Sequence, residues 1–349
     1  MSTPALPALA AQMVAQGKGL LAIDESIGTC NRRFAALGIA QTVDRRRAWR
    51  DLIVTTPGLA ESIGAIILNE ETIGQTTVSG TPFATAVVEA GIVPGVKVDA
   101  GTIDLAGHAP ERITEGLDEL SGRLNGFVAM GARFAKWRGV ITIDTGFPSR
   151  GCIEANAQTL ARYAAVCQQV GVLPVVEPEV LMDGPHDLAR CAAVTAAVLH
   201  AFFRHADEQG VVLEAMILKA NMVLPGTTCP NQSDLATIAD ATVSTLRHAV
   251  PAAVPAITFL SGGQAGELAS ARLNAMNVRF RGRMPWELGF SFARAIQQPA
   301  LAIWGGDDGQ REASQHALAH RARCDRAARK GTYDPTMDSA TFPRTVSAQ

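Results

Sequence analysis

The sequence carries almost no net charge. It has 31 lysine and arginine residues against 33 aspartate and glutamate residues, which gives a formal net charge of −2 at pH 7. A chain this close to neutrality offers no broad basic surface for nucleic acid, so any anionic ligand must be held by local cations. It also has no apolar run near the roughly 20 residues that a membrane-spanning helix needs. We therefore expect no nucleic-acid partner and no membrane partner.

Cysteine pairs with CxxC spacing are also absent. The six cysteines are scattered, at Cys30, Cys152, Cys167, Cys191, Cys229 and Cys324. Such scatter favours reduced thiols in a cytosolic protein. The N-terminal stretch 1–19 has no basic flank ahead of its apolar residues, which predicts an amphipathic helix and not a signal peptide. The sequence thus predicts a cytoplasmic protein.

The short motifs of several common enzyme classes are missing. No GxSxG elbow and no glycine-rich nucleotide loop of the right spacing occurs. Among the seven histidines, the clearest helical pair is His316 and His320, whose spacing of four could place both on one helix face. No third ligand accompanies this pair, and a zinc site needs at least three protein ligands. We therefore expect no metal and no cofactor.

Short apolar runs that end in polar or charged residues recur along the chain. With 47% hydrophobic and 18% charged residues, the 349-residue chain can bury a large core, which excludes a disordered chain. The eight runs are Gly19–Ser26, Ile63–Leu68, Ile92–Val98, Phe134–Ile143, Leu173–Val176, Ala215–Leu218, Ile257–Leu260 and Leu288–Phe290. Helical spacing of apolar residues fills the gaps over His186–Asp207, Glu154–Gln169, Asp234–His248 and Gln264–Met276.

Eight apolar strands that alternate with helices indicate one α/β domain, a (β/α)8 or TIM barrel that begins with the N-terminal helix. Parallel strands buried on both faces explain why the runs are almost continuously apolar. No fixed-period repeat and no linker divides the chain, so we expect the barrel to span residues 1–330. The segment 331–349 is rich in threonine, serine and proline and has little that can form a core, which predicts a flexible C-terminal tail.

Polar and charged side chains lie at or just beyond seven of the eight predicted strands. In a barrel the C-terminal strand ends converge on one mouth, so residues far apart in the chain become neighbours there. The residues collected in this way are Asp24, Lys97, Lys136, Arg138, Glu177, Glu179, Lys219, Ser261 and Arg294. A structural ion pair could account for any one of them, but their coincidence at one mouth favours a functional site.

Lys219 is the most unusual of these residues because it ends the apolar run Ala215–Leu218. One interpretation is a lysine whose stem lies along the barrel rim while its amine reaches water. The other is an amine with a depressed pKa, poised to form a Schiff base with a ketone. Lys136 on another strand would lower the pKa of Lys219 by like-charge repulsion. The iminium nitrogen would then stabilise the carbanion that forms when the adjacent carbon–carbon bond breaks.

Three carboxylates could serve that chemistry. Glu177 and Glu179 lie two apart on one predicted strand and would share a face if the strand is regular, although Pro178 could separate them. A carboxyl group near the amine can protonate the hydroxyl that leaves the carbinolamine. Asp24 can accept the hydroxyl proton of the substrate as the bond cleaves. We therefore take Lys219, Glu177, Asp24, Lys136 and Glu179 as catalytic candidates.

Two further stretches suit anionic groups. Ser261, Gly262 and Gly263 precede a predicted helix, and glycines let the backbone approach a phosphate at a helix N-terminus. Arg294 could close the same site, although a surface arginine and a plain strand–helix turn remain alternatives. A second phosphate would suit Ser26, Thr29, Arg32 and Arg33, which a solvated basic turn explains equally well. The substrate-binding candidates are completed by Lys97, Arg138 and Ser291.

Several long motifs together resemble the class I fructose-bisphosphate aldolases, the metal-independent Schiff-base type. These motifs are GKGLLAIDES, VPGVKVDAG, GARFAKWRGVITI, VGVLPVVEPEVLMDGPHDLARC, LEAMILKANMV, ITFLSGGQ and the pair FSFARA and WGG, which together cover roughly residues 17–306. The resemblance implies a β/α barrel, usually a homotetramer, that reversibly cleaves fructose 1,6-bisphosphate. The products are dihydroxyacetone phosphate and glyceraldehyde 3-phosphate, which link glycolysis and gluconeogenesis.

The resemblance also implies a role for each matching residue. Lys219 matches the Schiff-base lysine, Glu177 the principal acid and base, and Glu179 the glutamate that supports it. Asp24 matches the aspartate that handles the cleaved hydroxyl. Lys97 and Lys136 match cations that orient the substrate, and Arg138 matches the adjacent arginine. One phosphate site would comprise Ser261, Gly262 and Arg294; the other would comprise Ser26, Thr29, Arg32 and Arg33.

This chain departs from the family pattern at several positions. Arg32-Arg33 stands in place of the usual lysine-arginine pair, and Thr29 in place of a serine. Ala220 replaces the proline that usually follows the Schiff-base lysine, and Ala293 replaces a glycine. Animal members end in a tyrosine that assists proton transfer at the dihydroxyacetone carbon, whereas this chain ends TVSAQ. We therefore expect another group or water to transfer that proton.

Two alternatives to this lyase stay open at the level of sequence. One is a Schiff-base enzyme for a different phosphorylated sugar, although the paired arginines favour a doubly phosphorylated substrate. The other is a barrel retained only as a binding or scaffold protein, which predicts the loss of one or more of Asp24, Glu177 and Lys219. All three residues are present.

Overall fold

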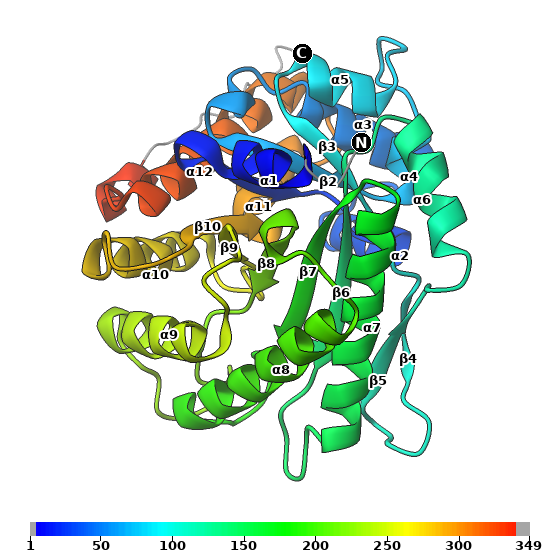
Figure 1. Ribbon diagram of the computed structural model, residues 1–349. Coiled ribbons are helices and arrows are strands. Elements are labelled where there is room, and N and C mark those ends of the chain that lie inside the picture. The colour runs from blue at the N-terminus through cyan, green and yellow to red at the C-terminus, as the bar shows by residue number, and fades with distance from the viewer. Residues whose placement is uncertain (1–4, 340–349) are drawn as a thin grey trace.

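The computed structural model describes residues 5–339. Its centre is a closed barrel of parallel strands in the order β1-β10-β9-β8-β7-β6-β3-β2, with helices around it (Figure 1). The strands are β1 Gly19–Ala22, β2 Ile63–Leu68, β3 Val93–Lys97, β6 Phe134–Ile141, β7 Leu173–Val180, β8 Ile217–Ala220, β9 Ala256–Phe259 and β10 Glu287–Phe292. Each corresponds to one predicted apolar run, so the predicted (β/α)8 barrel is confirmed.

Several helices begin where a side chain satisfies a free backbone N–H group. Ser26, Thr42, Ser149, Asp187 and Asp234 each accept a hydrogen bond from the amide three residues on. The helices are α1 Leu6–Val14, α2 Ile27–Ala35, α3 Val43–Val54, α4 Glu70–Ile73, α5 Phe83–Glu89, α6 Leu120–Ala129, α7 Arg150–Gln169, α8 Leu188–Glu208, α9 Leu235–Ala249, α10 Gly266–Arg279, α11 Arg294–Trp304 and α12 Arg311–Lys330.

The interior of the barrel changes from apolar to charged along each strand. In β7 the alternation of side chains directs Leu173 and Val175 into the lower barrel, and Glu177 and Glu179 follow at the same period of two. In β6, Phe134 likewise precedes Lys136. On these strands, one step of two residues therefore separates the last apolar side chain of the lower barrel from the first charged side chain of the mouth.

Helix α1 closes the apolar end of the barrel. Its buried side chains, Leu6, Leu9, Ala10, Met13 and Val14, form one cluster with the lower interior residues of the strands. The backbone of α1 comes so near to β2 that a Cβ on Gly64 would lie 2.1 Å from the carbonyl oxygen of Met13. The predicted N-terminal helix is thus a structural plug, and the charged mouth is left as the accessible end.

A two-stranded antiparallel hairpin, β4 Gly101–Asp104 and β5 Arg112–Glu115, was not predicted from the sequence. Its strands carry no buried apolar stripe, and their half-exposed residues give no clear period. The hydroxyl of Thr114 donates to the carbonyl of Arg138 at 2.7 Å, which fixes the hairpin beside β6. Gly101 and Thr102 of this hairpin line the cavity at the mouth, and Figure 1 shows the hairpin outside the barrel.

The packed part of the chain continues past the predicted boundary at residue 330. Tyr333 is buried, and its hydroxyl donates to Asp338, which also pairs with Arg321 of α12. A short 3-10 turn, Pro335–Ser339, follows. The buried ring of Tyr333 and the ion pair of Asp338 therefore hold the segment 331–339 against the barrel, which its composition did not predict. The remainder of the predicted tail, 340–349, lies outside the described residues.

Asp325 on α12 makes the stability of the folded protein depend on pH. Burial raises the pKa of Asp325 to about 7, and Ser270 and Arg321 offset this only in part. The protonated form is therefore favoured in the folded protein, while the unfolded chain releases the proton near pH 4. The stability that Asp325 contributes is fully present below about pH 4 and is lost as the pH rises to about 7.

We predict that Asp325→Asn removes this dependence. Between pH 5 and pH 8 the free energy of unfolding should fall by about 3 kcal/mol more in the wild type than in the variant, because only the wild type must ionise a buried carboxyl. Urea unfolding at both pH values measures the difference. The exposed Asp334→Asn should track the wild type. Parallel losses in wild type and Asp325→Asn would contradict the assignment.

All six cysteines are buried free thiols, as predicted from their spacing. Within residues 5–339, no helix combines the length and the apolar character that a membrane crossing requires. The same residues contain no cluster of three or more histidine, cysteine, aspartate or glutamate side chains arranged to hold a metal ion.

Candidate active site

A cavity of about 320 Å³ opens at the charged mouth of the barrel. Thirteen of the sixteen predicted site residues line it: Asp24, Ser26, Thr29, Lys97, Lys136, Arg138, Glu177, Glu179, Lys219, Ser261, Gly262, Ser291 and Arg294. Three predicted residues do not line it, namely Arg32, Arg33 and Gly263. The convergence of strand ends therefore brings together residues that span most of the chain.

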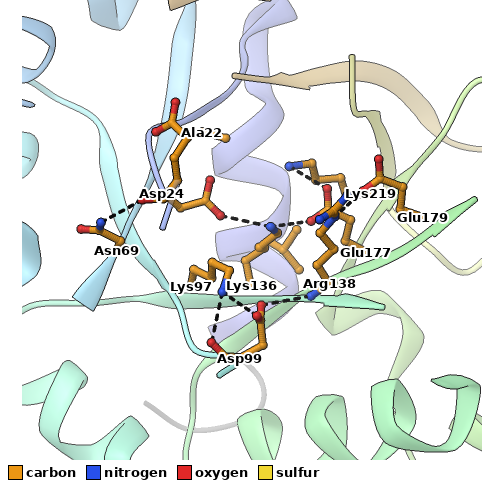
Figure 2. A network of polar contacts seen from close by, with 12 residues as sticks. Ala22, Asp24, Asn69, Lys97, Asp99, Lys136, Arg138, Glu177, Glu179 and Lys219 are labelled. Carbon is orange, nitrogen blue, oxygen red and sulfur yellow. Dashed lines mark hydrogen bonds and ion pairs between the residues drawn. The ribbon is translucent and has the colours of Figure 1, made fainter. Parts of the chain in front are cut away.

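Four buried charged groups form the centre of this site (Figure 2). The Lys136 ammonium lies between two carboxylates, at 3.0 Å from Asp24 and 2.6 Å from Glu177. The Lys219 ammonium contacts the other oxygen of Glu177 at 3.1 Å. All four side chains are at least nine-tenths buried, at 3% to 7% exposure. Two cations and two carboxylates balance, so the mouth holds these charges without net burial of charge.

Both carboxylates are ionised in this arrangement. Burial alone would raise the pKa of Asp24, but the Lys136 and Lys219 ammonium groups outweigh it and lower the pKa to about 2. Burial likewise opposes ionisation of Glu177, and the same two lysines lower its pKa below the ordinary value. In return, the carboxylates of Asp24 and Glu177 outweigh the burial of Lys136 and raise its pKa. Lys136 is consequently a fixed positive charge.

The structure contradicts the interpretation of Lys219 as a rim lysine. Its side chain is 4% exposed and points to Glu177, and does not reach to water along the rim (Figure 2). Lys219 belongs to β8, where it pairs in register with Thr258 of β9. A rigid strand therefore delivers the amine into the cavity.

The residue after Lys219 is part of the regular strand pairing, although it is alanine and not the proline of the family pattern. Ala220 pairs with Phe259 and accepts a hydrogen bond from Leu260 N at 2.9 Å. The side chain of Asn221 then connects β7 to α8. Its oxygen accepts a hydrogen bond from Val180 N, and its NH2 group donates to the Thr195 hydroxyl. These hydrogen bonds fix the backbone at residues 220 and 221, where the family pattern has a proline that would restrict it.

Glu177 and Glu179 share one face of a regular strand. Pro178 lies inside β7, which pairs with β6 along its whole length, and it introduces no kink that separates the two glutamates. Glu179 pairs with Arg138, the neighbouring strand's guanidinium, whereas Glu177 contacts the two lysines. Each glutamate thus has its own cationic partner.

Asp99 is a site residue that the sequence analysis missed. Its carboxylate accepts from Lys97 Nζ at 2.5 Å and from the backbone N–H groups of Gly101 and Arg138 (Figure 2). It thereby ties Lys97 to the hairpin and to β6. The signal that could have revealed it is an acidic residue two places after a lysine at a strand end. Gly101 and Thr102 of the unpredicted hairpin also line the cavity.

One end of the cavity is suited to an anion. Ser261 and Gly262 lie just ahead of α10, and Arg294 is the first residue of α11. Gly263 has φ +91°, and a Cβ there would lie 3.2 Å from the Arg294 guanidinium, so glycine permits this approach. Ser291 is buried, and its hydroxyl has no hydrogen-bond partner among the described residues. An incoming phosphate oxygen could satisfy that hydroxyl.

Two hydroxyl groups that line the cavity, Ser26 and Thr29, are linked to an arginine outside its lining. Ser26 donates to the Thr29 hydroxyl at 3.1 Å, and Arg32 Nη2 donates to the same hydroxyl at 2.9 Å. Arg33 turns away from this group: it pairs with Glu25 and donates to Gln297 and Gln298. Glu25 also pairs with the buried Arg50. Sequence adjacency to Arg32 therefore does not place Arg33 in the cavity.

Neither tyrosine of the chain reaches the cavity. The Tyr163 hydroxyl is buried against the carbonyl of Val175, and the Tyr333 hydroxyl bonds to Asp338. Ala293, where the family pattern has glycine, lines the cavity with φ −111° and ψ −90° and precedes α11.

The barrel and its polar mouth define a (β/α)8 enzyme whose site lies at the C-terminal ends of the strands. The family model "Fructose-bisphosphate aldolase class-I" matches residues 5–347. This chain therefore belongs to the class I fructose-bisphosphate aldolase family. It is accordingly a lyase of the glycolytic aldolase type.

Individual relatives agree with this family. A probable fructose-bisphosphate aldolase class 1 of Xanthomonas campestris pv. campestris is 49% identical over 324 residues, covering 93% of this chain and 96% of the relative. A cytoplasmic isozyme of fructose-bisphosphate aldolase from Pisum sativum is 46% identical over 329 residues, covering 94% and 91%. The fructose-bisphosphate aldolase of Plasmodium falciparum, solved in complex with TRAP and an inhibitor, superposes with a TM-score of 0.93 at 41% identity, covering 95% and 96%.

Proposed function

We propose that this chain cleaves fructose 1,6-bisphosphate reversibly through a Schiff base on Lys219. The observation that carries the proposal is the buried Lys219 amine, which touches the Glu177 carboxylate at 3.1 Å inside a cavity also lined by Ser26, Ser261 and Arg294. An amine so placed can attack a ketone, and the adjacent carboxyl group can manage the protons of that addition.

Schiff-base formation would use Lys219 and Glu177 together. The Lys219 ammonium first passes a proton to Glu177, which it contacts at 3.1 Å. The neutral amine then adds to the C2 carbonyl of the substrate to give a carbinolamine. The C2 hydroxyl leaves as water with a proton from Glu177, and an iminium remains. In the carbinolamine the Lys219 nitrogen is neutral, so one of the three cations that lower the pKa of Glu177 loses its charge and that pKa rises. Lys136 stays charged throughout.

Carbon–carbon cleavage would use Asp24. The carboxylate takes the proton of the C4 hydroxyl, the C3–C4 bond breaks, and its electron pair moves into the iminium to form an enamine. Glyceraldehyde 3-phosphate leaves. Protonation at C3 and hydrolysis of the imine then release dihydroxyacetone phosphate and regenerate Lys219. Lys136 contacts both Asp24 and Glu177, so it connects the two proton-handling groups.

Two groups of hydroxyl, glycine and arginine residues at the cavity support a doubly phosphorylated substrate. Ser261, Gly262, Ser291 and Arg294 would hold one phosphate, and Ser26, Thr29 and Arg32 the other. We include Gly263 with the first set because it adjoins Arg294. Arg33 would join the second set only by leaving Glu25. Lys97 and Arg138, with Glu179 as partner, would orient the sugar between them.

An aldolase assay coupled to dihydroxyacetone phosphate, the product that all these ketoses would release, tests this function. We expect kcat/KM for fructose 1,6-bisphosphate to exceed that for fructose 1-phosphate, because the latter has no second phosphate for the group of Ser26, Thr29 and Arg32. Preference for fructose 1-phosphate or sedoheptulose bisphosphate would instead support a related Schiff-base enzyme. No turnover of any phosphorylated ketose would support a scaffold.

Chelator treatment is a further prediction for this assay. We expect full activity after incubation with EDTA and desalting, because the iminium nitrogen supplies the electron sink for which other aldolases need a Lewis acid. The measurement is kcat before and after treatment, with and without added Zn²⁺. Activity that is lost on chelation and restored by the metal would refute the Schiff-base route.

Removal of residues 340–349 should leave proton exchange at C3 of dihydroxyacetone phosphate unchanged. That segment contains no tyrosine, and both tyrosines of the chain lie outside the cavity. Release of label from C3-tritiated dihydroxyacetone phosphate in the absence of aldehyde measures the step. The cut is placed after Ser339 because Tyr333 and Asp338 are packed. Loss of exchange would show that the removed residues transfer the proton.

We also propose that the chain acts as a homotetramer in the cytoplasm. The family resemblance supports the tetramer, and relatives named as cytoplasmic or cytosolic aldolases support the location. Sedimentation equilibrium tests the assembly state, and a monomer at assay concentration would overturn that part of the proposal.

A further inference from the structure

Arg272 is a buried cation on α10 that the proposed mechanism does not use. Its side chain is 7% exposed. One end-nitrogen, Nη1, donates to the side-chain oxygen of Gln264 at 2.6 Å. The Nε atom is buried and has no hydrogen-bond partner among residues 5–339. A neutral amide is therefore the principal partner of a guanidinium that stays protonated in proteins.

No acidic side chain neutralises Arg272. Within residues 5–339 none lies at salt-bridge distance from it, and the remaining residues of the chain, 1–4 and 340–349, contain no aspartate or glutamate. Burial lowers the pKa of Arg272 with no opposing carboxylate. Other buried arginines of the chain differ in this respect, since Arg46 pairs with Glu71 and Arg50 with Glu25. Charged groups taken out of water normally require such a partner.

Gln264 connects this charge to the anion end of the cavity. Its backbone N–H donates to the carbonyl of Ser261 at 2.9 Å, which closes the turn that contains Gly262 and Gly263. Its side chain is buried, with the oxygen on Arg272 and the amide nitrogen 3.9 Å from the sulfur of Met222. Arg272 thus fixes the residue that ends the turn, although it does not itself line the cavity.

We propose that Arg272 is a positioning residue for phosphate recognition, which holds the Ser261–Gln264 turn and adds an unneutralised positive charge behind it. This inference rests on the proposed function, because it assumes that the turn binds a phosphate of the ketone. A charge in a poorly hydrated interior acts over a longer range than a surface charge. The favoured ligand is therefore the dianionic phosphate of dihydroxyacetone phosphate and of the bisphosphate substrate.

A pair of ketones that differ only in the phosphate tests this role. The half-saturating concentration for borohydride-trapped adduct on Lys219 is measured with dihydroxyacetone phosphate and with dihydroxyacetone, in the full chain. For Arg272→Met we expect the value for the phosphate ester to rise about three- to tenfold and the value for dihydroxyacetone to stay unchanged. Arg272→Lys should keep most of the phosphate affinity. The matched control is Arg279→Met. Arg279 is an exposed arginine on the same helix as Arg272, and it pairs with Asp240 of α9. This variant should change neither value.

The ratio of the two half-saturating concentrations within one sample does not depend on the fraction of folded protein. If Arg272→Met does not fold, Gln264→Glu gives a second route, because a carboxylate at that position would neutralise Arg272 and should raise the value for the phosphate ester selectively. Equal weakening for both ketones would show a merely structural role and overturn the inference. So would no change, or the same change in Arg279→Met. Absence of any adduct in the wild type would instead overturn the proposed function.

Discussion

Lys219→Met lowers kcat for fructose 1,6-bisphosphate cleavage by about 10⁴-fold or more, because the variant has no amine with which to form the iminium. No other group in the cavity replaces it easily. Lys136 is held between Asp24 and Glu177, whose carboxylates raise its pKa and keep it protonated and non-nucleophilic. Steady-state cleavage rates of wild type and variant measure the effect.

The folded state should tolerate this change. Glu177 keeps its contact with Lys136 at 2.6 Å, so no carboxylate is left unpaired. Methionine has nearly the length of the lysine stem and suits the buried position on β8. We expect the circular dichroism spectrum of the variant to match the wild type. A Lys219→Met enzyme that retains more than a tenth of the wild-type kcat would contradict the assignment of Lys219.

Glu177→Gln should lower kcat by about 10²- to 10⁴-fold, the usual contribution of a positioned acid and base. Glutamine keeps the shape of the side chain but cannot give a proton to the departing hydroxyl. The slow step should move to Schiff-base formation, so single-turnover trapping should show a slow rise of adduct on Lys219. The surface variant Glu154→Gln is the matched control.

The pH dependence separates Glu177 from its neighbour. If Glu177 supplies the proton, the variant loses the limb of the pH–rate profile that reports this carboxyl group, whereas Glu154→Gln keeps it. Glu179→Gln should disturb the position of Arg138 and weaken substrate binding more than it changes kcat. Unchanged adduct formation in Glu177→Gln would move the acid role to another residue.

The barrel could be predicted from the sequence because each buried strand is short and apolar and each is followed by a helical stripe. Residues 63–68 agree with β2 at both ends, since Ser62 and Asn69 bound the run and all its side chains are buried. Strand β7 runs on to Val180, past the predicted end at Val176, because pairing with β6 and polar contacts inside the mouth stabilise residues that are not apolar. Hydrophobic periodicity cannot indicate such positions.

The hairpin β4–β5 marks the limit of that reasoning. Its strands hold each other by backbone bonds and by the pair Arg112 and Asp104, not by a buried face. Without apolar alternation there is no signal to read. The short 3-10 turn and the burial of Tyr333 were missed for a similar reason, because a single ring and one ion pair anchor the segment.

The mouth residues could be predicted because topology alone brings strand ends together. Lys136, Glu177 and Lys219 needed no knowledge of side-chain angles. Asp99 and Arg33 did need it. Asp99, two residues after the predicted Lys97, belongs to the site because its carboxylate accepts a hydrogen bond from the backbone N–H of Arg138. Arg33 was predicted for the site but lies outside it because its guanidinium pairs with Glu25.

The most direct test of this account is to locate the covalent adduct. Dihydroxyacetone phosphate is added to the wild-type chain, the imine is reduced with borohydride, and the peptides are analysed by mass spectrometry. We predict one modified peptide, with the added mass on Lys219, and no modification in Lys219→Met. An adduct on Lys136 or Lys97, or none at saturating dihydroxyacetone phosphate, would contradict the account.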